Sequence, residues 1–244
     1  MADLALNLIE IIDRNLYERS CDVRWWATDA AVVGCAAGGV AAADAAARLG
    51  VILDAYTVYL DIWICAPDGR VLANGRPQRF QGAALATVAD QAWFREALAG
   101  PEQGFAVADI APSPALDGQL VATYAAPIRA GGAADGPAIG VIGIFFDWGR
   151  QAQLVVDGVR LEAAARRVTR CLIIDAGRRV LAASDRQGVL AERIDLAEGC
   201  PALGHALRPG QVIAWARTPG YETYRGLGWY GVLIRTDAAE LVAG

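Results

Sequence analysis

Apolar residues at the start of the chain recur at the spacing of one face of an α-helix. The pattern predicts a long helix from residue 3 to about residue 33, with a strongly charged opposite face on which Glu10 precedes Arg14 by four residues. We expect the glycine-rich stretch 34–39 to break this helix and an alanine-rich helix to follow from about residue 40 to residue 49. The apolar positions of the long helix are Leu4, Leu8, Ile12, Leu16, Val23 and Trp26.

Beyond residue 50 the pattern changes to short runs rich in β-branched and aromatic residues. Two runs within residues 56–77 flank Pro67-Asp68-Gly69, which predicts two strands joined by a tight turn. Residues 172–184 repeat this pattern, and residues 118–125 are echoed by residues 210–217. Two echoes in the same order predict a duplicated module. The expected fold class is α+β, with a long N-terminal helix followed by two antiparallel-sheet modules.

Aromatic, acidic and turn residues cluster in residues 89–128. Residues 92–100 predict a short helix that Gly100 ends and Pro101 cannot continue. Residues 105–110 and 118–128 predict an antiparallel hairpin whose loop contains Asp117-Gly118. A helix that faces such a sheet leaves a crevice, so this stretch predicts the wall of a small-molecule pocket.

Composition and motifs exclude several functions. The net charge is −5, lysine is absent and no arginine-rich run occurs, which argues against a nucleic-acid surface. The five cysteines are dispersed without C-x-x-C spacing and His205 is the single histidine, so local spacing provides no zinc or haem site, and we expect no cofactor. No G-x-S-x-G motif is present, and the G-x-G-x-x-G match at 226–231 enters a strand rather than a helix. We therefore expect a protein without catalytic activity.

Apolar runs are too short for a membrane-spanning helix or a secretory signal. This pattern fits either a cytoplasmic protein or the sensor part of a receptor whose membrane helices lie outside the sequence.

The order of these features resembles the double Cache (dCache) sensor domains of bacterial chemoreceptors and sensor kinases. The resemblance rests on the long helix leading into YLDIWICAPDGRVLANG, then WFREALAG, FAVADI, YAAPI and GVIGIFFDW, followed by a reduced second copy. It implies an N-terminal helical segment (1–49), a membrane-distal PAS-like module that binds a small metabolite (50–148), a connector helix (149–167) and a smaller membrane-proximal module (168–244). It also implies a periplasmic location and a signalling domain beyond the C-terminus. Residues 14–29 would provide a homodimer contact, or would dock within the chain through their tryptophans.

Amino-acid-binding members of this family carry an Arg-x-Trp-Tyr run and an acidic residue in the last strand of the distal module. Here the run keeps Trp93 but has Gln91 and Phe94, and the acidic position is Phe145, with Asp147 two residues later. A buried carboxylate without an arginine partner carries a large desolvation cost. These departures argue against a standard α-amino-acid ligand.

The candidate ligand-binding residues are Trp93, Asp109, Tyr124, Tyr59, Trp63, Phe94 and Asp147. The aromatic members could equally pack in the core, Asp109 could cap a turn and Asp147 could simply end its strand. An aspartate with aromatic neighbours suits an amine, whereas Arg76, Arg79 or Arg95 turned inward would suit an organic acid. Two other functions stay open: a partner-binding scaffold without a ligand, and a redox sensor that works through Cys21 and Cys35.

Overall fold

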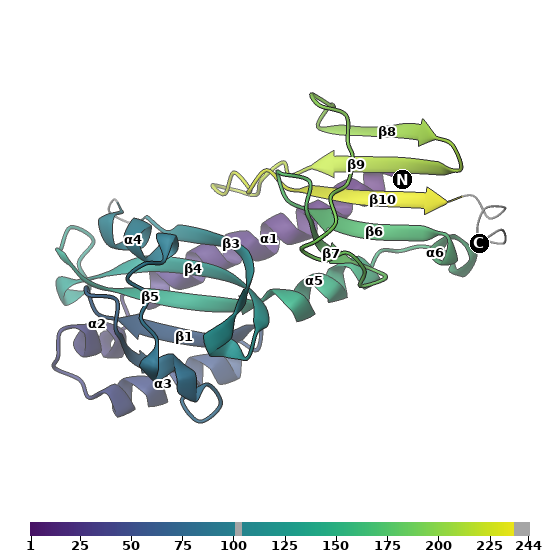
Figure 1. Ribbon diagram of the computed structural model, residues 1–244. Coiled ribbons are helices and arrows are strands. Elements are labelled where there is room, and N and C mark those ends of the chain that lie inside the picture. The colour runs from purple at the N-terminus through teal and green to yellow at the C-terminus, as the bar shows by residue number, and fades with distance from the viewer. Residues whose placement is uncertain (101–103, 237–244) are drawn as a thin grey trace. The chain divides into compact units, whose positions relative to one another are not determined.

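The computed structural model describes residues 1–100 and 104–236 and contains two five-stranded antiparallel sheets (Figure 1). Contacts divide the chain into two compact units. The first unit comprises Glu18–Trp148, and the second comprises Met1–Tyr17 together with the described residues from Gly149 onward. Helix α1 (Ala2–Trp26) contributes its first part to the second unit and its remainder to the first.

The sheet of the first unit has the strand order β2-β1-β5-β4-β3. Its middle strands are almost continuously apolar because both faces of the sheet are covered. On one face Val141, Gly143 and Phe145 of β5 point towards α4, and on the other face Ile142 and Ile144 point away from it. The elements are α2 (Ala30–Ala36), α3 (Ala42–Ala55), β1 (Tyr59–Cys65), β2 (Val71–Asn74), η1 (Gln81–Leu85), α4 (Ala92–Ala99), β3 (Ala106–Ser113), η2 (Pro114–Leu116), β4 (Gln119–Arg129), η3 (Ala130–Gly132) and β5 (Ala138–Asp147).

The second unit repeats this topology in a reduced form, with the strand order β7-β6-β10-β9-β8. The predicted duplication and the α+β fold class are therefore confirmed. The elements are α5 (Trp148–Asp157), α6 (Ala163–Arg167), β6 (Thr169–Ile174), β7 (Val180–Ala183), β8 (Leu203–Arg208), β9 (Gln211–Arg217) and β10 (Tyr230–Thr236).

Three helix predictions were wrong in their boundaries. The long helix ends at Trp26, and a separate helix α2 begins at Ala30, because Asp29 adopts an extended conformation and its carboxylate accepts the Ala31 N–H at 2.9 Å. Helix α2 runs through the expected break at Gly34 and ends at Ala36.

Helix α3 extends to Ala55, beyond the predicted end at residue 49, because Ile52 and Leu53 continue its buried face. The predicted connector helix over 149–167 is divided into α5 and α6. Helix α4 ends at Ala99 as predicted, whereas Pro101 lies outside the described residues.

Within the second unit, α1 is held to the loop after β9 by a buried carboxylate. The Thr218 hydroxyl donates to Asp13, with oxygen–oxygen distances of 2.5 and 2.6 Å, and the Gly220 N–H donates to it at 2.9 Å. Burial nevertheless raises the pKa of Asp13 above its ordinary value of 3.8, because desolvation of the charged form outweighs these hydrogen bonds.

This raised pKa predicts a pH dependence of stability. Between pH 3.8 and the folded-state pKa, the folded chain binds more protons at Asp13 than the unfolded chain does, so this residue's contribution falls as the pH rises. Asp13→Asn removes the titrating carboxyl group and with it this pH dependence. We therefore expect the free energy of unfolding of the variant, relative to that of the wild type, to increase from pH 4 to pH 7. Urea unfolding at both pH values measures the difference, with the exposed Asp3→Asn as control. If the wild type instead becomes more stable relative to the variant as the pH rises, the raised pKa of Asp13 is contradicted.

Candidate functional site

A cavity of about 260 Å³ lies in the first unit, between the sheet, α4 and the loop that precedes α4. It lies on the α4 face of the sheet, where β1, β3, β4 and β5 all contribute side chains. Its lining residues are Trp63, Ala86, Thr87, Val88, Gln91, Trp93, Ala108, Asp109, Ala111, Pro112, Ser113, Pro114, Ala115, Val121, Thr123 and Phe145.

Three aromatic rings form the apolar wall of this cavity. Trp63 and Phe145 contact each other with ring centroids 4.3 Å apart and tilted by 53°, and Trp93 meets Phe145 edge to face at 6.2 Å. Gly143 provides the space for Trp93, because a Cβ atom at this position would lie 3.3 Å from the indole ring. The rings therefore come from β1, β5 and α4 and meet only in the folded chain.

Asp61 fixes the orientation of Trp63, and sequence reasoning did not identify it. This carboxylate is completely buried and accepts hydrogen bonds from the Trp63 indole N–H at 2.9 Å, the Asn74 amide at 2.9 Å, and the backbone N–H groups of Ile62 and Arg76 at 2.9 and 3.0 Å. Burial raises its pKa even though all four bonds favour the charged form. A lone acid inside the apolar run YLDIWIC was the available signal.

The rim of the cavity is polar. Asp109 lies at a β-bulge, where the register between β3 and β4 shifts, and its carboxylate accepts the Ile110 N–H at 2.7 Å. The Pro67-Asp68-Gly69 turn positions another part of the rim, because the Gly69 carbonyl accepts the Val88 N–H at 2.8 Å. A side chain at Gly69 would clash with Ala89, since its Cβ would lie 2.5 Å from the Ala89 nitrogen.

The structure brings together three of the predicted site residues, namely Trp63, Trp93 and Asp109. Phe94 is buried beside Trp93, with ring centroids 6.1 Å apart, but it does not line the cavity. Asp147 ends β5 opposite Val121 and is also absent from the lining.

Tyr59 and Tyr124 lie on the opposite face of the sheet. Simple alternation puts Tyr59 on the same face as Trp63, but a register shift between Tyr59 and Asp61 turns the tyrosine away. Tyr124 alternates with Thr123, which lines the cavity, and stacks on Phe105 at a centroid distance of 6.0 Å.

On that opposite face Tyr59 joins a buried polar cluster with α1. Its hydroxyl donates to Asp22 at 2.5 Å, and the Arg19 Nε donates to the same carboxylate oxygen at 3.2 Å. The Arg19 guanidinium lies over the rings of Tyr59 and Phe146, at 5.0 and 5.3 Å from their centroids. Burial raises the pKa of Tyr59, so its hydroxyl stays protonated and continues to donate.

Of the larger cavities in the described residues, two are lined by arginines that donate to groups within the chain. The first, of about 390 Å³ in the same unit, is lined by Arg24 and Arg129. The Arg24 Nε donates to the Ser20 carbonyl at 2.7 Å. The two terminal nitrogens of Arg129 donate to the carbonyls of Gly136 and Gly100, whereas its buried Nε has no hydrogen-bond partner among the described residues.

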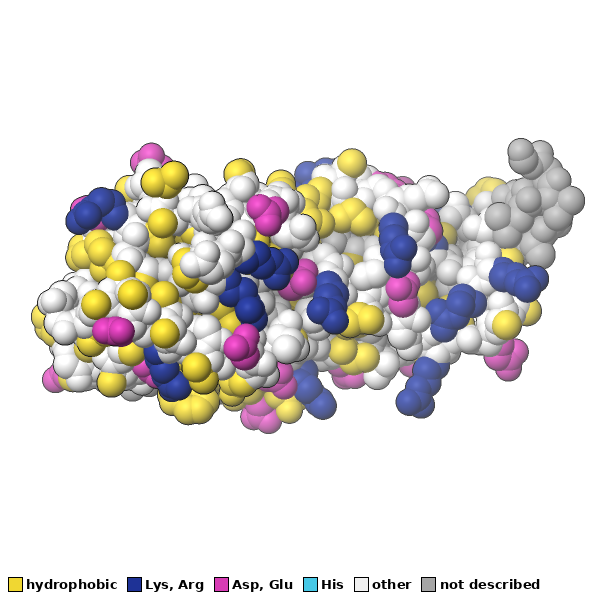
Figure 2. Space-filling view, turned by 90° about the horizontal axis from the view of Figure 1, so that it is seen from below, with side chains coloured by type: hydrophobic (Ala, Val, Ile, Leu, Met, Phe, Trp, Pro, Cys, Tyr) yellow, Lys and Arg dark blue, Asp and Glu magenta, His cyan; other side chains and the backbone are white. Residues whose placement is uncertain are grey.

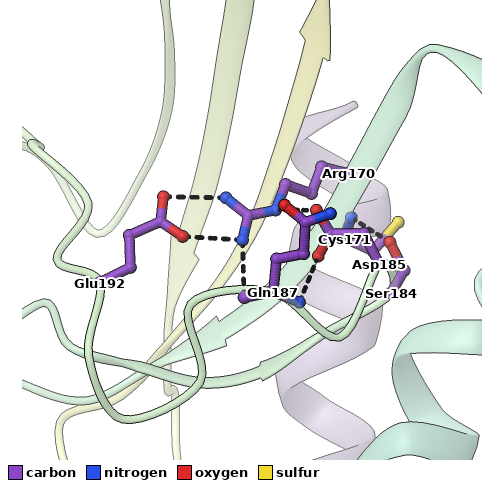
Figure 3. Close-up of polar contacts among 6 residues, drawn as sticks. All are labelled: Arg170, Cys171, Ser184, Asp185, Gln187 and Glu192. Carbon is purple, nitrogen blue, oxygen red and sulfur yellow. Dashed lines mark hydrogen bonds and ion pairs between the residues drawn. The ribbon is translucent and has the colours of Figure 1, made fainter.

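The other cavity, of about 580 Å³, belongs to the second unit. Figure 3 shows its central cation, Arg170, between Glu192 and Asp185. Arg170 donates to both carboxylate oxygens of Glu192 at 2.8 and 2.7 Å and pairs with Asp185 at 2.7 Å. This cluster ties the loop after β7 to β6 and leaves Arg170 little capacity for an external anion.

Metal-ligating side chains do not gather anywhere in the described part of the chain in groups of three or more. All five cysteines are free, including Cys21 on α1 and Cys35 on α2. On the face seen in Figure 2, arginine side chains are interspersed with carboxylates and form no continuous basic surface. Within the described residues, no helix has both the length and the apolar character needed to cross a membrane.

Comparison with known proteins identifies the fold through structure. No protein-family model and no curated protein sequence matches the chain. Solved structures match over nearly the whole chain. The chain has a double Cache fold.

Two of these solved structures are ligand-binding domains of chemoreceptors, and a third is the extracellular domain of a kinase. The Pseudomonas fluorescens chemoreceptor CtaA ligand-binding domain, in complex with L-alanine, has a TM-score of 0.64 and 13% identity over 97% of this chain and 95% of that one. The Pseudomonas aeruginosa chemoreceptor PctC ligand-binding domain, in complex with GABA, has a TM-score of 0.69 and 15% identity over 96% of each chain. The extracellular domain of the histidine kinase rpHK1S-Z16 has a TM-score of 0.69 and 15% identity over 100% of this chain and 96% of that one.

The role of Asp61 in holding the aromatic wall of the cavity can be tested by substitution. We expect Asp61→Ala to lower the free energy of unfolding by about 3–5 kcal/mol, because it leaves buried donors, including the Trp63 indole N–H, without an acceptor. Asp54→Ala is the control, since its carboxylate is 76% exposed and pairs with Arg76 at 3.4 Å. That exposed pair is expected to contribute about 0.5 kcal/mol or less. Urea denaturation at pH 7 compares the two, and equal losses would show that Asp61 does not organise the wall.

Proposed function

We propose that this double Cache domain is a non-catalytic sensory module that binds a small metabolite in the cavity lined by Trp63, Trp93 and Asp109. The observation that carries the proposal is the cavity itself, a concave site with an aromatic wall and a polar rim on a rigid sheet. The ligand complexes of CtaA and PctC support it, because they show that domains of this fold can hold small molecules.

We further propose that the domain faces the periplasm and is joined to the signalling part of a chemoreceptor or sensor kinase. The match to an extracellular kinase domain supports this location. Free cysteines argue mildly for a reducing compartment, but three of the five are buried. Burial raises the pKa of Cys65 to about 12 and that of Cys171 to about 11, which disfavours the reactive thiolate. These thiols are therefore compatible with an oxidising compartment.

Adjacent residues of β5 provide a route from the cavity to α1. Phe145 lines the cavity, whereas Phe146 lies on the other face under the Arg19 guanidinium. A ligand that displaces β5 would therefore change the contact between Phe146 and the helix. Ligand binding would then shift the population of two arrangements of α1 and the sheet within the first unit.

A homodimer through α1 remains part of the proposal. Arg19, Asp22 and Trp26 are buried within the chain, which leaves only part of the segment 14–29 for a partner. Trp25 is 68% exposed, so this apolar side chain is the candidate for a contact.

A thermal-shift screen against amino acids, amines, organic acids and purines tests the binding function. A ligand at 100 times its Kd adds about 2.7 kcal/mol of stability, which corresponds to about 5–10 °C in a chain of this size. We expect Trp93→Ala to remove the shift, because it deletes one wall of the cavity, and Trp25→Ala to retain it. Circular dichroism checks that both variants are folded. If no compound stabilises the wild type, the partner-binding alternative is favoured instead.

Hydrogen exchange tests the proposed route to the helix. With the ligand found in the screen, we expect altered exchange of the α1 amides of residues 18–26. Phe146→Leu should weaken this change while ligand affinity stays within about twofold, because Phe146 does not line the cavity. Ile142→Val, on the same face of β5, is the matched control. If the ligand alters the exchange of the α1 amides as much in the Phe146 variant as in the wild type, the coupling does not pass through Phe146.

A further inference from the structure

We propose that the cavity selects small organic cations that carry no carboxylate, such as methylated or quaternary ammonium compounds. This inference rests on the proposed sensory function and assigns its ligand class. It follows from the charge, the aromatic lining and the volume of the cavity.

The only formal charge among the described residues that line the cavity is negative. It belongs to Asp109 on the rim. Arg76, Arg79 and Arg95, the arginines that could have reversed this preference, do not line the cavity. Arg76 donates to the Leu53 carbonyl at 3.1 Å, and Arg79 lies over the Phe80 ring at 4.6 Å. A carboxylate placed in the cavity would face Asp109, and none of the described lining residues supplies a guanidinium to offset the cost of its desolvation.

The aromatic wall favours a cation for a second, independent reason. The Trp63 indole N–H is already bonded to Asp61, so this side chain offers the cavity aromatic surface and no free hydrogen-bond donor. Phe145 has no polar atom, and Trp93 completes the wall. Ring faces are electronegative and attract ammonium groups, above all where water is excluded.

The volume sets an upper limit on the ligand. At about 260 Å³, the cavity lies just below the usual range of about 300–1,000 Å³ for ligand pockets. It therefore suits a compact ammonium compound rather than a peptide or a nucleoside.

Three probes of matched shape separate charge from size. Choline has a trimethylammonium group, 3,3-dimethyl-1-butanol is its neutral isostere, and glycine betaine has the same ammonium group with a carboxylate. By isothermal titration calorimetry we expect choline to bind at least tenfold more tightly than either of the others. Equal affinity for choline and its neutral isostere, or tighter binding of betaine, would overturn the inference.

Two substitutions locate the effect in the cavity. Asp109→Asn is expected to weaken choline binding at least fivefold and to leave any binding of the neutral isostere unchanged. Asp90→Asn removes the same charge from an exposed position outside the lining and should leave choline binding unchanged. Equal losses in the two variants would attribute the preference to the overall charge of the domain and overturn the assignment.

A gain-of-function variant gives the opposite prediction. Gln91 lines the cavity immediately before α4, and Gln91→Arg would place a guanidinium there. We expect this variant to bind betaine at least tenfold more tightly than the wild type does, and choline more weakly. No gain for betaine would contradict the charge argument.

The proposed sensory function and the proposed preference for organic cations can fail separately. If a neutral or anionic metabolite from the wider screen binds in a Trp93-dependent way while choline does not, the sensory function stands and the cation inference falls. If no compound of any class binds, both fall.

Discussion

The first unit depends on the burial of β5 on both faces. A strand in the middle of a covered sheet places successive side chains in two separate environments, so Phe145 belongs to the cavity and Phe146 to the contact with α1. Because the two side chains share one backbone, the strand cannot shift at one face without disturbing the other. The close approach of Trp93 to Gly143 strengthens this constraint, since the indole ring lies directly against the strand. Protein interiors are close-packed, so they transmit displacement rather than absorb it.

The duplicated topology produces different interiors in the two units. In the first, α4 covers the face of the sheet and leaves space between its tryptophan and the strands. In the second, the described chain between β7 and β8 contains no helix, and Ile194 and Leu196 from this loop pack directly against Trp215 and Tyr230. The residue of the second unit that aligns with Trp63 is Leu172, which is smaller and fully buried in the same cluster. The part of this face around Leu172 is therefore filled by the chain's own side chains, and the cavity of about 580 Å³ in the second unit is lined by Arg170 and Glu192, which pair with each other. These differences favour the first unit as the place of the ligand.

Hydrophobic periodicity predicted most of the architecture, because helix and strand spacing follow directly from burial. Trp63, Trp93 and Asp109 were predicted as ligand-binding residues from their aromatic and acidic side chains, and the fold places all three in the lining of one cavity. It could not predict that Tyr59 turns away from Trp63, since the bulge that separates them depends on pairing with a distant strand. The end of α1 at Trp26 was missed for a related reason, because the Asp29 cap interrupts an otherwise continuous apolar stripe. The role of Asp61 required the fold itself, since two of its four donors lie on residues 74 and 76, far along the sequence.

Directional polar contacts hold α1 in each unit. In the first unit the helix is fixed by Arg19 and Asp22 with Tyr59, and in the second unit by Asp13 with Thr218. Apolar contacts tolerate small changes of register, but a buried carboxylate that loses its donors is left with an uncompensated desolvation cost. Buried carboxylates of this kind therefore contribute little to the net free energy of folding. They destabilise every position of the helix in which they lose their donors, so only one or a few positions of the helix are stable. A helix held in this way has discrete arrangements rather than a continuum, which is the property that a sensory domain needs in order to convert occupancy of a cavity into a signal.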